Sequence, residues 1–186
     1  MSCARVDRPS AAAGNTATAR ADPLAWQKDP AAVADNDLAR RIVREATSVE
    51  TFRVRPRWTS EESKRRSNPK YAAEFIGFYP IDRRGPVMKG DFTGRLAAVL
   101  LDESNYIRFE PGQTKKCIFE PGVAFRMRSG ADRVDILLCF TCQQLSVNCS
   151  RGHLRLPAGD FDPGVARFAA LAKEAFPKDP VVAALP

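Results

Sequence analysis

The chain of 186 residues is poor in the groups that most familiar active sites need. It has a single histidine, His153, and it contains no G-x-S-x-G motif, no phosphate-binding glycine loop and no H-E-x-x-H motif. His153 lies beside a predicted turn, where an exposed structural histidine is more common than a catalytic base. The sequence therefore argues against an enzyme of these classes.

Long hydrophobic runs are also missing. The longest, Leu96–Leu101 and Ile136–Phe140, fall far short of the roughly 20 residues that a membrane-spanning helix needs. A complete signal peptide is absent as well, because there is no charged segment followed by a long apolar one at the N-terminus. Residues 1–30 hold almost no large apolar side chain before Leu24 and are predicted to form a flexible tail. We expect residues 31–186 to form a single α+β domain.

The N-terminus nevertheless carries one suggestive feature, Cys3. A small residue before a cysteine, followed by a polar tether, is what a bacterial lipoprotein retains once its apolar leader has been removed. Cys3 is therefore a candidate lipid anchor, which would associate the protein with a membrane. The alternative is an incidental thiol in a disordered tail.

Basic residues outnumber acidic ones, 29 to 22, and they crowd one segment. This basic patch could contact nucleic acid or another anionic surface, although a solvated surface stretch is the commoner meaning of such a run. Its members are Arg53, Arg55, Arg57, Lys64, Arg65, Arg66 and Lys70.

Periodicity predicts three helices. The first begins near Asp35 or Asp37, with Asp35 placed as its cap, and ends near Thr47 or Ser48. The second opens at Asp91 and the third follows a predicted cap at Asp162 and ends before Pro177. Between them the patterns predict an edge strand at 49–55, irregular structure at 56–74, a strand at 75–79 and a loop at 81–86.

A β-hairpin is predicted around the turn at residues 129–132. With Arg128 opposite Arg133, three apolar pairs line one face and Arg126 faces Asp135 on the other. We expect that ion pair to contribute at most about 1 kcal/mol if it is exposed. Further strands at 145–149 and 153–156 complete an antiparallel β-meander packed against two or three helices.

The hairpin brings thiols together. If its register continues, Cys117 and Cys142 become diagonal neighbours, whereas a kink at Pro121 would bring Cys139 within reach of Cys117 instead. Cys149 lies at the next turn, farther away.

Three chemistries are open to this cluster. A disulfide from Cys117 to Cys139 or Cys142 needs an oxidising compartment and would stabilise the fold by roughly 2–4 kcal/mol. A zinc site would use Cys139, Cys142 and Cys117 with Cys149 or His153, but one C-x-x-C is a weak signal. Thiol exchange needs an exposed, activated cysteine. In a reducing cytoplasm the same thiols would be small apolar core residues.

The motifs in the second half of the chain support one resemblance. The runs Lys116–Phe125 and Val134–Cys142, followed by Asp160-Phe161-Asp162 and a helix ending Phe176-Pro177, resemble an uncharacterised bacterial protein family. Its members carry a C-x-F-x-P-G-V and L-C-F-x-C motif pair and are often predicted lipoproteins. The resemblance implies a cell-envelope or periplasmic location and a link from Cys117 to the Cys139–Cys142 pair. It implies no reaction.

Three hypotheses follow from these observations. The first is a non-enzymatic bacterial cell-envelope lipoprotein with a structural cysteine cluster and no cofactor. The second is a cytoplasmic module that is stabilised by zinc or associated with nucleic acid. The third is a thiol oxidoreductase, which would be overturned if Cys139 and Cys142 were both buried.

Overall fold

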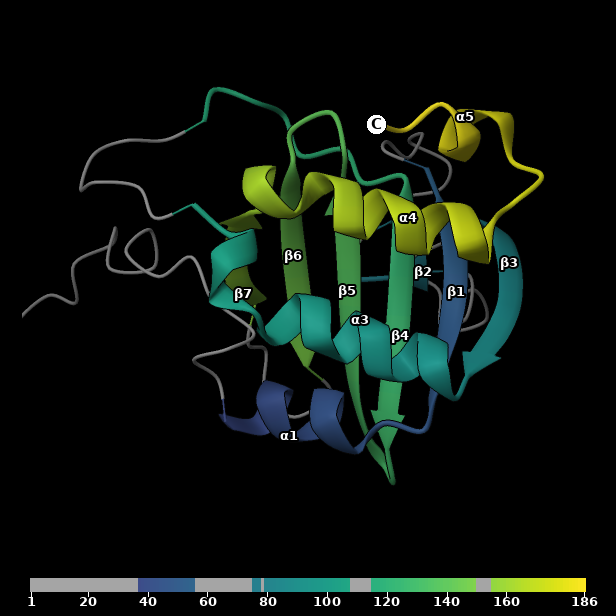
Figure 1. The fold of residues 1–186 in the computed structure, drawn as a ribbon, viewed down its shortest axis with the longest axis vertical. Coiled ribbons are helices and arrows are strands. Elements are labelled where there is room, and N and C mark those ends of the chain that lie inside the picture. Colours follow the sequence, from purple (N-terminus) through teal and green to yellow (C-terminus); the bar gives the residue numbers. More distant parts are fainter. Residues whose placement is uncertain (1–36, 56–74, 78, 108–114, 150–154) are drawn as a thin grey trace, which may run out of the picture.

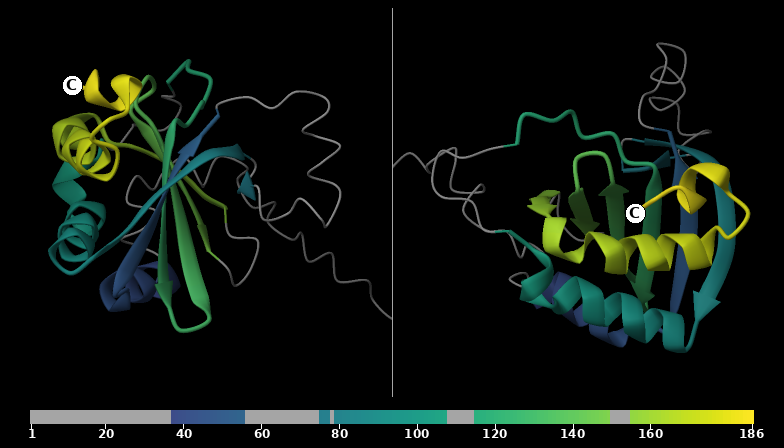
Figure 2. Two further views of the ribbon diagram at one scale, coloured as in Figure 1. Left: turned by 90° about the vertical axis from the view of Figure 1, so that its right-hand side faces the viewer. Right: turned by 45° about the horizontal axis from the view of Figure 1, so that its top comes forward.

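The computed structural model describes residues 37–55, 75–77, 79–107, 115–149 and 155–186. They form an α+β fold, as predicted, built on an antiparallel seven-stranded sheet of order β2-β3-β1-β4-β5-β6-β7 (Figure 1). The helices α1, α3 and α4 cover one face of this sheet (Figure 2). The elements are α1 (Asp37–Glu45), β1 (Ser48–Val54), β2 (Phe75–Ile76), β3 (Tyr79–Lys89), α3 (Asp91–Leu101), η3 (Glu103–Asn105), β4 (Val123–Ser129), β5 (Asp132–Cys139), β6 (Gln144–Cys149), β7 (Arg155–Asp160), η4 (Asp162–Gly164), α4 (Val165–Ala175) and α5 (Pro180–Ala183).

The β4–β5 hairpin has the predicted register over its full length, from Val123 opposite Leu138 to Ser129 opposite Asp132. Gly130 has a φ of 57°, a conformation that glycine adopts without steric cost, and so closes the turn. The apolar residues of one face of this hairpin contact the helices. They are Val123, Phe125, Met127, Val134, Ile136 and Leu138.

The ion pair on the other face of this hairpin is buried, so the expectation for an exposed pair does not apply. The side chains of Arg126 and Asp135 are only 11% and 5% exposed, and two N–H groups of Arg126 donate to the two carboxylate oxygens. The Arg126 guanidinium also lies over the ring of Phe52, 5.5 Å from its centroid. These neighbours exclude water from the pair, which makes its loss more costly than the loss of a surface pair.

The prediction that residues 49–55 form an edge strand is wrong, because β1 lies inside the sheet between β3 and β4. The predicted loop at 81–86 is also wrong, since these residues belong to β3. A shift in register between Glu50 and Phe52 admits Gly85 opposite β1. A Cβ at Gly85 would lie within 2.3 Å of Thr51 Oγ1, so the strand requires glycine there. The local Gly-Pro pair thus marks a β-bulge rather than a loop.

The predicted strand at 75–79 is interrupted. Ile76 pairs with Tyr79 across a turn at Gly77, which has a φ of 58°. A Cβ at Gly77 would lie 3.7 Å from the Leu137 side chain, so this turn folds over the sheet face opposite the helices. It contributes to a small second hydrophobic cluster that comprises Phe52, Val54, Ile76, Ala124 and Leu137.

Two of the helices on the first face have the predicted ends. α3 begins at Asp91, and α4 ends at Ala175, two residues before Pro177. Asp162, however, is not the cap of α4, because it opens the short 3-10 helix η4 and its carboxylate bonds to Lys115 instead. The main core lies between these helices and the sheet. Its fully buried phenylalanine and leucine side chains are Leu96, Leu100, Phe125, Leu138, Phe161 and Phe168.

Some sequence predictions fall on residues that the structure does not describe. These are the flexible tail at 1–30 with Cys3, the cap at Asp35, the irregular stretch at 56–74, the turn at 150–152 and the start of the strand predicted at 153–156. Within the described residues, no helix is long and apolar enough to cross a membrane.

Candidate functional site

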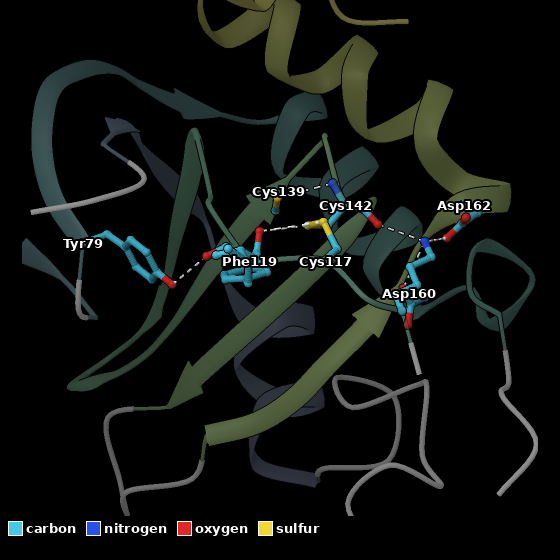
Figure 3. The surroundings of a disulfide bond; sticks show 9 residues. Tyr79, Cys117, Phe119, Cys139, Cys142, Asp160 and Asp162 are labelled. Carbon is cyan, nitrogen blue, oxygen red and sulfur yellow. Dashed lines mark hydrogen bonds and ion pairs between the residues drawn. A yellow bond between two sulfur atoms is a disulfide. The ribbon is translucent and has the colours of Figure 1, made fainter. Parts of the chain in front are cut away.

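A disulfide joins Cys117 to Cys142 at one end of the sheet (Figure 3). Their Cα atoms are 5.8 Å apart, and the two residues are separated by 25 positions in the chain. Cys117 is exposed on the segment before β4, whereas Cys142 is buried in the β5–β6 turn. Of the two bonded residues, Cys117 is therefore the one that faces solvent.

The end of the β4–β5 ladder bears on the choice of Cys142 over Cys139. The regular register ends at Val123 opposite Leu138, and the Gly122 N–H donates to that same Leu138 carbonyl oxygen over 3.1 Å, one residue out of register. The ladder is therefore irregular directly after Pro121. The sequence linked a regular ladder to pairing with Cys142 and a kink at Pro121 to pairing with Cys139. The structure has the pairing with Cys142 although the ladder is irregular at Gly122, so the expected link between a kink at Pro121 and Cys139 is wrong.

Cys139 is a free thiol with no solvent exposure, directly beside the disulfide. The backbone N–H of Cys142 donates to Cys139 Sγ over 3.4 Å (Figure 3). Cys149 is also free, but it pairs with Val134, whereas Cys139 pairs with Gln144 at the opposite end of the β5–β6 ladder. Burial, with a smaller effect from Asp135, raises the pKa of the Cys149 thiol. Three of the sulfurs thus form the cluster and Cys149 stands apart.

The cluster as folded does not have the features of a zinc site. Zinc binds thiolates, and a disulfide leaves none on Cys117 or Cys142. Among the described residues, no group of three or more histidine, cysteine or acidic side chains is arranged to hold a metal ion. His153, the other candidate ligand, lies outside those residues.

A lysine between two carboxylates lies next to the disulfide. Lys115 Nζ donates to Asp162 Oδ2 over 2.5 Å and to the Cys142 carbonyl oxygen over 2.9 Å, and it lies 3.1 Å from Asp160 Oδ1. Burial opposes the charge on Lys115, but the bonds to Asp162 and Asp160 outweigh it and raise the pKa of this lysine. Burial also raises the pKa of Asp160, which Lys115 offsets only in part. Lys115 is therefore held as a cation and is unsuited to act as a base.

Sequence reasoning missed this lysine. Lys115 and Asp162 are 47 positions apart, so no local spacing relates them. Asp162 also had a plausible local explanation as a helix cap. The one signal was the Asp160-Phe161-Asp162 run that the family resemblance includes.

We refer to residues 115–122 as the strap, because they cross the sheet end and are fastened at three points. Lys115 and Cys117 provide two of them. At the third, the Tyr79 hydroxyl donates to the Phe119 carbonyl oxygen over 3.2 Å, and the two rings meet edge to face with centroids 6.1 Å apart (Figure 3). Between these points Ile118 is 69% exposed. The arrangement holds an exposed segment rigidly, as a structural staple does.

Burial of both cysteines overturns the hypothesis of an oxidoreductase that attacks external substrates with its C-x-x-C pair. Cys139 and Cys142 are 0% and 3% exposed, so neither can attack an external substrate. An oxidoreductase needs such a nucleophile at its surface.

One predicted member of the basic patch, Arg53, is not available at the surface. The Arg53 side chain is only 14% exposed, because it packs on the helical side of the sheet and pairs with Asp179 at 2.9 Å. It also donates to the Gly122 carbonyl oxygen at the end of the strap. Arg55 is half exposed and lies 3.8 Å from Asp82. The other members lie outside the described residues, namely Arg57, Lys64, Arg65, Arg66 and Lys70.

Comparison with known proteins adds no assignment: no protein-family model matches the chain, and neither a curated protein nor a solved structure is significantly similar to it.

Proposed function

We propose that the chain is a non-enzymatic domain of the bacterial cell envelope, which a disulfide stabilises and a lipid on Cys3 anchors. The observation that carries this proposal is the Cys117–Cys142 disulfide with Cys117 at the surface. Structural disulfides persist in oxidising compartments, whereas cytosolic thiol systems keep such accessible pairs reduced. The bacterial family that the motif pair resembles, with its predicted lipoproteins, favours the same location.

The surroundings of the disulfide agree with a structural role. Cys142 is buried against the sheet, and the Lys115 and Phe119 contacts fix the strap on either side of Cys117. Holding the strap by three contacts orders a surface segment that has few backbone partners of its own. We infer that the domain presents this surface to a partner in the envelope.

Counting thiols in the protein purified from its host tests the proposal. Cells are quenched in acid, the unfolded protein is alkylated, and its mass is measured before and after reduction. The chain has five cysteines and the disulfide uses two, so 5 − 2 = 3 thiols should react, or two if Cys3 carries a lipid. Reduction should release two more, mapped to Cys117 and Cys142.

A Cys149→Ser variant is the matched control, because Cys149 is a free cysteine away from the cluster. It should lose one alkylation and keep the disulfide. Alkylation of all five cysteines in the native protein, with no lipid, would overturn the proposal. Recovery of the protein in the cytosolic fraction alone would do the same.

A further inference from the structure

The buried thiol of Cys139 has no role in the staple described above, yet it lies against one of the two bonded cysteines. Its Sγ accepts a hydrogen bond from the backbone N–H of Cys142, and the Cys142 Sγ is only three bonds from that nitrogen. Cys139 is the last residue of β5, and Cys142 lies in the turn that joins β5 to β6, where the Gln143 N–H bonds back to the Phe140 carbonyl oxygen. The third thiol and the disulfide are thus held together by one tight turn (Figure 3).

Such an arrangement permits thiol–disulfide exchange within the chain. A thiolate attacks one sulfur of a disulfide and the other sulfur leaves. Cys139 Sγ contacts the backbone of Cys142, so we take the Cys142 sulfur as the one attacked. The leaving sulfur is then that of Cys117, the exposed residue of the pair.

We propose that Cys117 is a latent surface thiol, masked in the Cys117–Cys142 disulfide and released when Cys139 displaces it from Cys142. The S–S bond from Cys142 to Cys117 breaks and one from Cys142 to Cys139 forms. The proton lost by Cys139 is balanced by the proton that Cys117 takes up from water. The number of disulfides does not change, so no external oxidant or reductant is consumed.

The exchange would change the strap. Its covalent attachment at Cys117 is lost, while the noncovalent contacts of Lys115 and Phe119 remain. The new bond joins the end of β5 to the β5–β6 turn and does not involve the strap. Cys117 becomes a free nucleophile next to the exposed Ile118, where a disulfide or an electrophile from solvent can reach it.

The two contacts of the strap also explain why the Cys117–Cys142 form is the one seen. Lys115 bonds to the carbonyl oxygen of Cys142 itself, and Phe119 packs on Tyr79, so the strap is kept close to the turn. Cys117 therefore stays near Cys142 after it is displaced and can return. The exchanged form is a minor state that a thiol-trapping reagent can accumulate.

This inference requires the disulfide of the proposed function, and one experiment separates the two. Oxidised wild-type protein is incubated with iodoacetamide without any reductant, under native conditions, and samples are quenched in acid and mapped by mass spectrometry. The expected result is gradual alkylation of Cys117 with one disulfide retained, now between Cys139 and Cys142. If no disulfide is present at the start, the proposed function fails.

The decisive control is Cys139→Ser, which keeps the Cys117–Cys142 disulfide and removes the attacking thiol. Its Cys117 should take up no label over the same period, whereas Cys149→Ser should behave as wild type. A disulfide that persists in the wild type with Cys117 unlabelled would overturn the inference alone. Equal labelling of Cys117 in Cys139→Ser would overturn it too. Because the first arm uses unmodified protein, poor folding of a variant does not affect it.

Discussion

Removing the disulfide should cost a predictable amount of stability. The bond closes a loop between residues 25 positions apart, and the chain-entropy relation for a loop of that size gives about 3.5 kcal/mol in the free energy of unfolding. For a domain of this length, a loss of that size lowers the midpoint of thermal unfolding by about 7–14 °C. Reduction of the wild-type protein should produce this loss in full.

The comparison needs three samples followed by far-UV circular dichroism in urea: oxidised wild type, reduced wild type and reduced Cys117→Ser. Cys117 is exposed, so its replacement by serine disturbs no packing. The two reduced proteins should therefore agree within about 0.5 kcal/mol. Keeping the variant reduced also prevents any Cys139–Cys142 bond from forming.

Two outcomes would refute this reasoning. If oxidised and reduced wild type unfold at the same urea concentration, the disulfide does not constrain the unfolded chain. If reduced Cys117→Ser is much less stable than reduced wild type, the loss comes from packing and not from the bond. Cys149→Ser serves as the control and should show the same gap between its oxidised and reduced forms.

Three further predictions concern residues away from the disulfide. Asp179 caps α5 and pairs with two arginines, contacts that together hold its pKa below the ordinary value despite burial. Its ionised carboxylate therefore stabilises the fold above about pH 4, and this stabilisation is lost as the pH falls through the lowered pKa. In Asp179→Asn, the free energy of unfolding should fall less steeply over the same acid range. Gly85→Ala should destabilise by about 1–3 kcal/mol in urea unfolding, because its Cβ would overlap the packed side chains of Thr51 and Phe176. Gly94→Ala, in open space on α3, should stabilise slightly, and equal effects of the two substitutions would contradict the bulge. Asp135→Asn should cost about 3 kcal/mol by leaving Arg126 buried without its counter-charge, and a loss below 1 kcal/mol would mean that water reaches the pair.

Local patterns were sufficient where the physical cause is local. Alternation of apolar residues on both sides of the turn at Gly130 set the hairpin register, because a slip of one residue would turn every apolar side chain outward. The same holds for α3 and α4, where spacing and Pro177 determined the start of one helix and the end of the other.

Local sequence patterns gave wrong predictions where a residue far along the chain determines the local structure. Gly85-Pro86 has the chemistry of a turn, but pairing with β1 holds it in a strand. Asp162 is well placed for a cap, but a lysine 47 positions away binds it. Arg53 is part of a basic run, yet its side chain lies on the helical side of the sheet and forms an ion pair with Asp179.

The sequence by itself determined that Cys117 lies across a hairpin from a C-x-x-C pair, since the alternation of side chains brings these positions to one sheet end. It left the partner of Cys117 open. Only the tertiary structure decided between Cys142 and Cys139, because the choice depends on the path that the segment before β4 takes past the irregularity at Gly122. Burial, which distinguishes the exposed Cys117 from the enclosed Cys139, likewise arises from the packing of segments far apart in the chain.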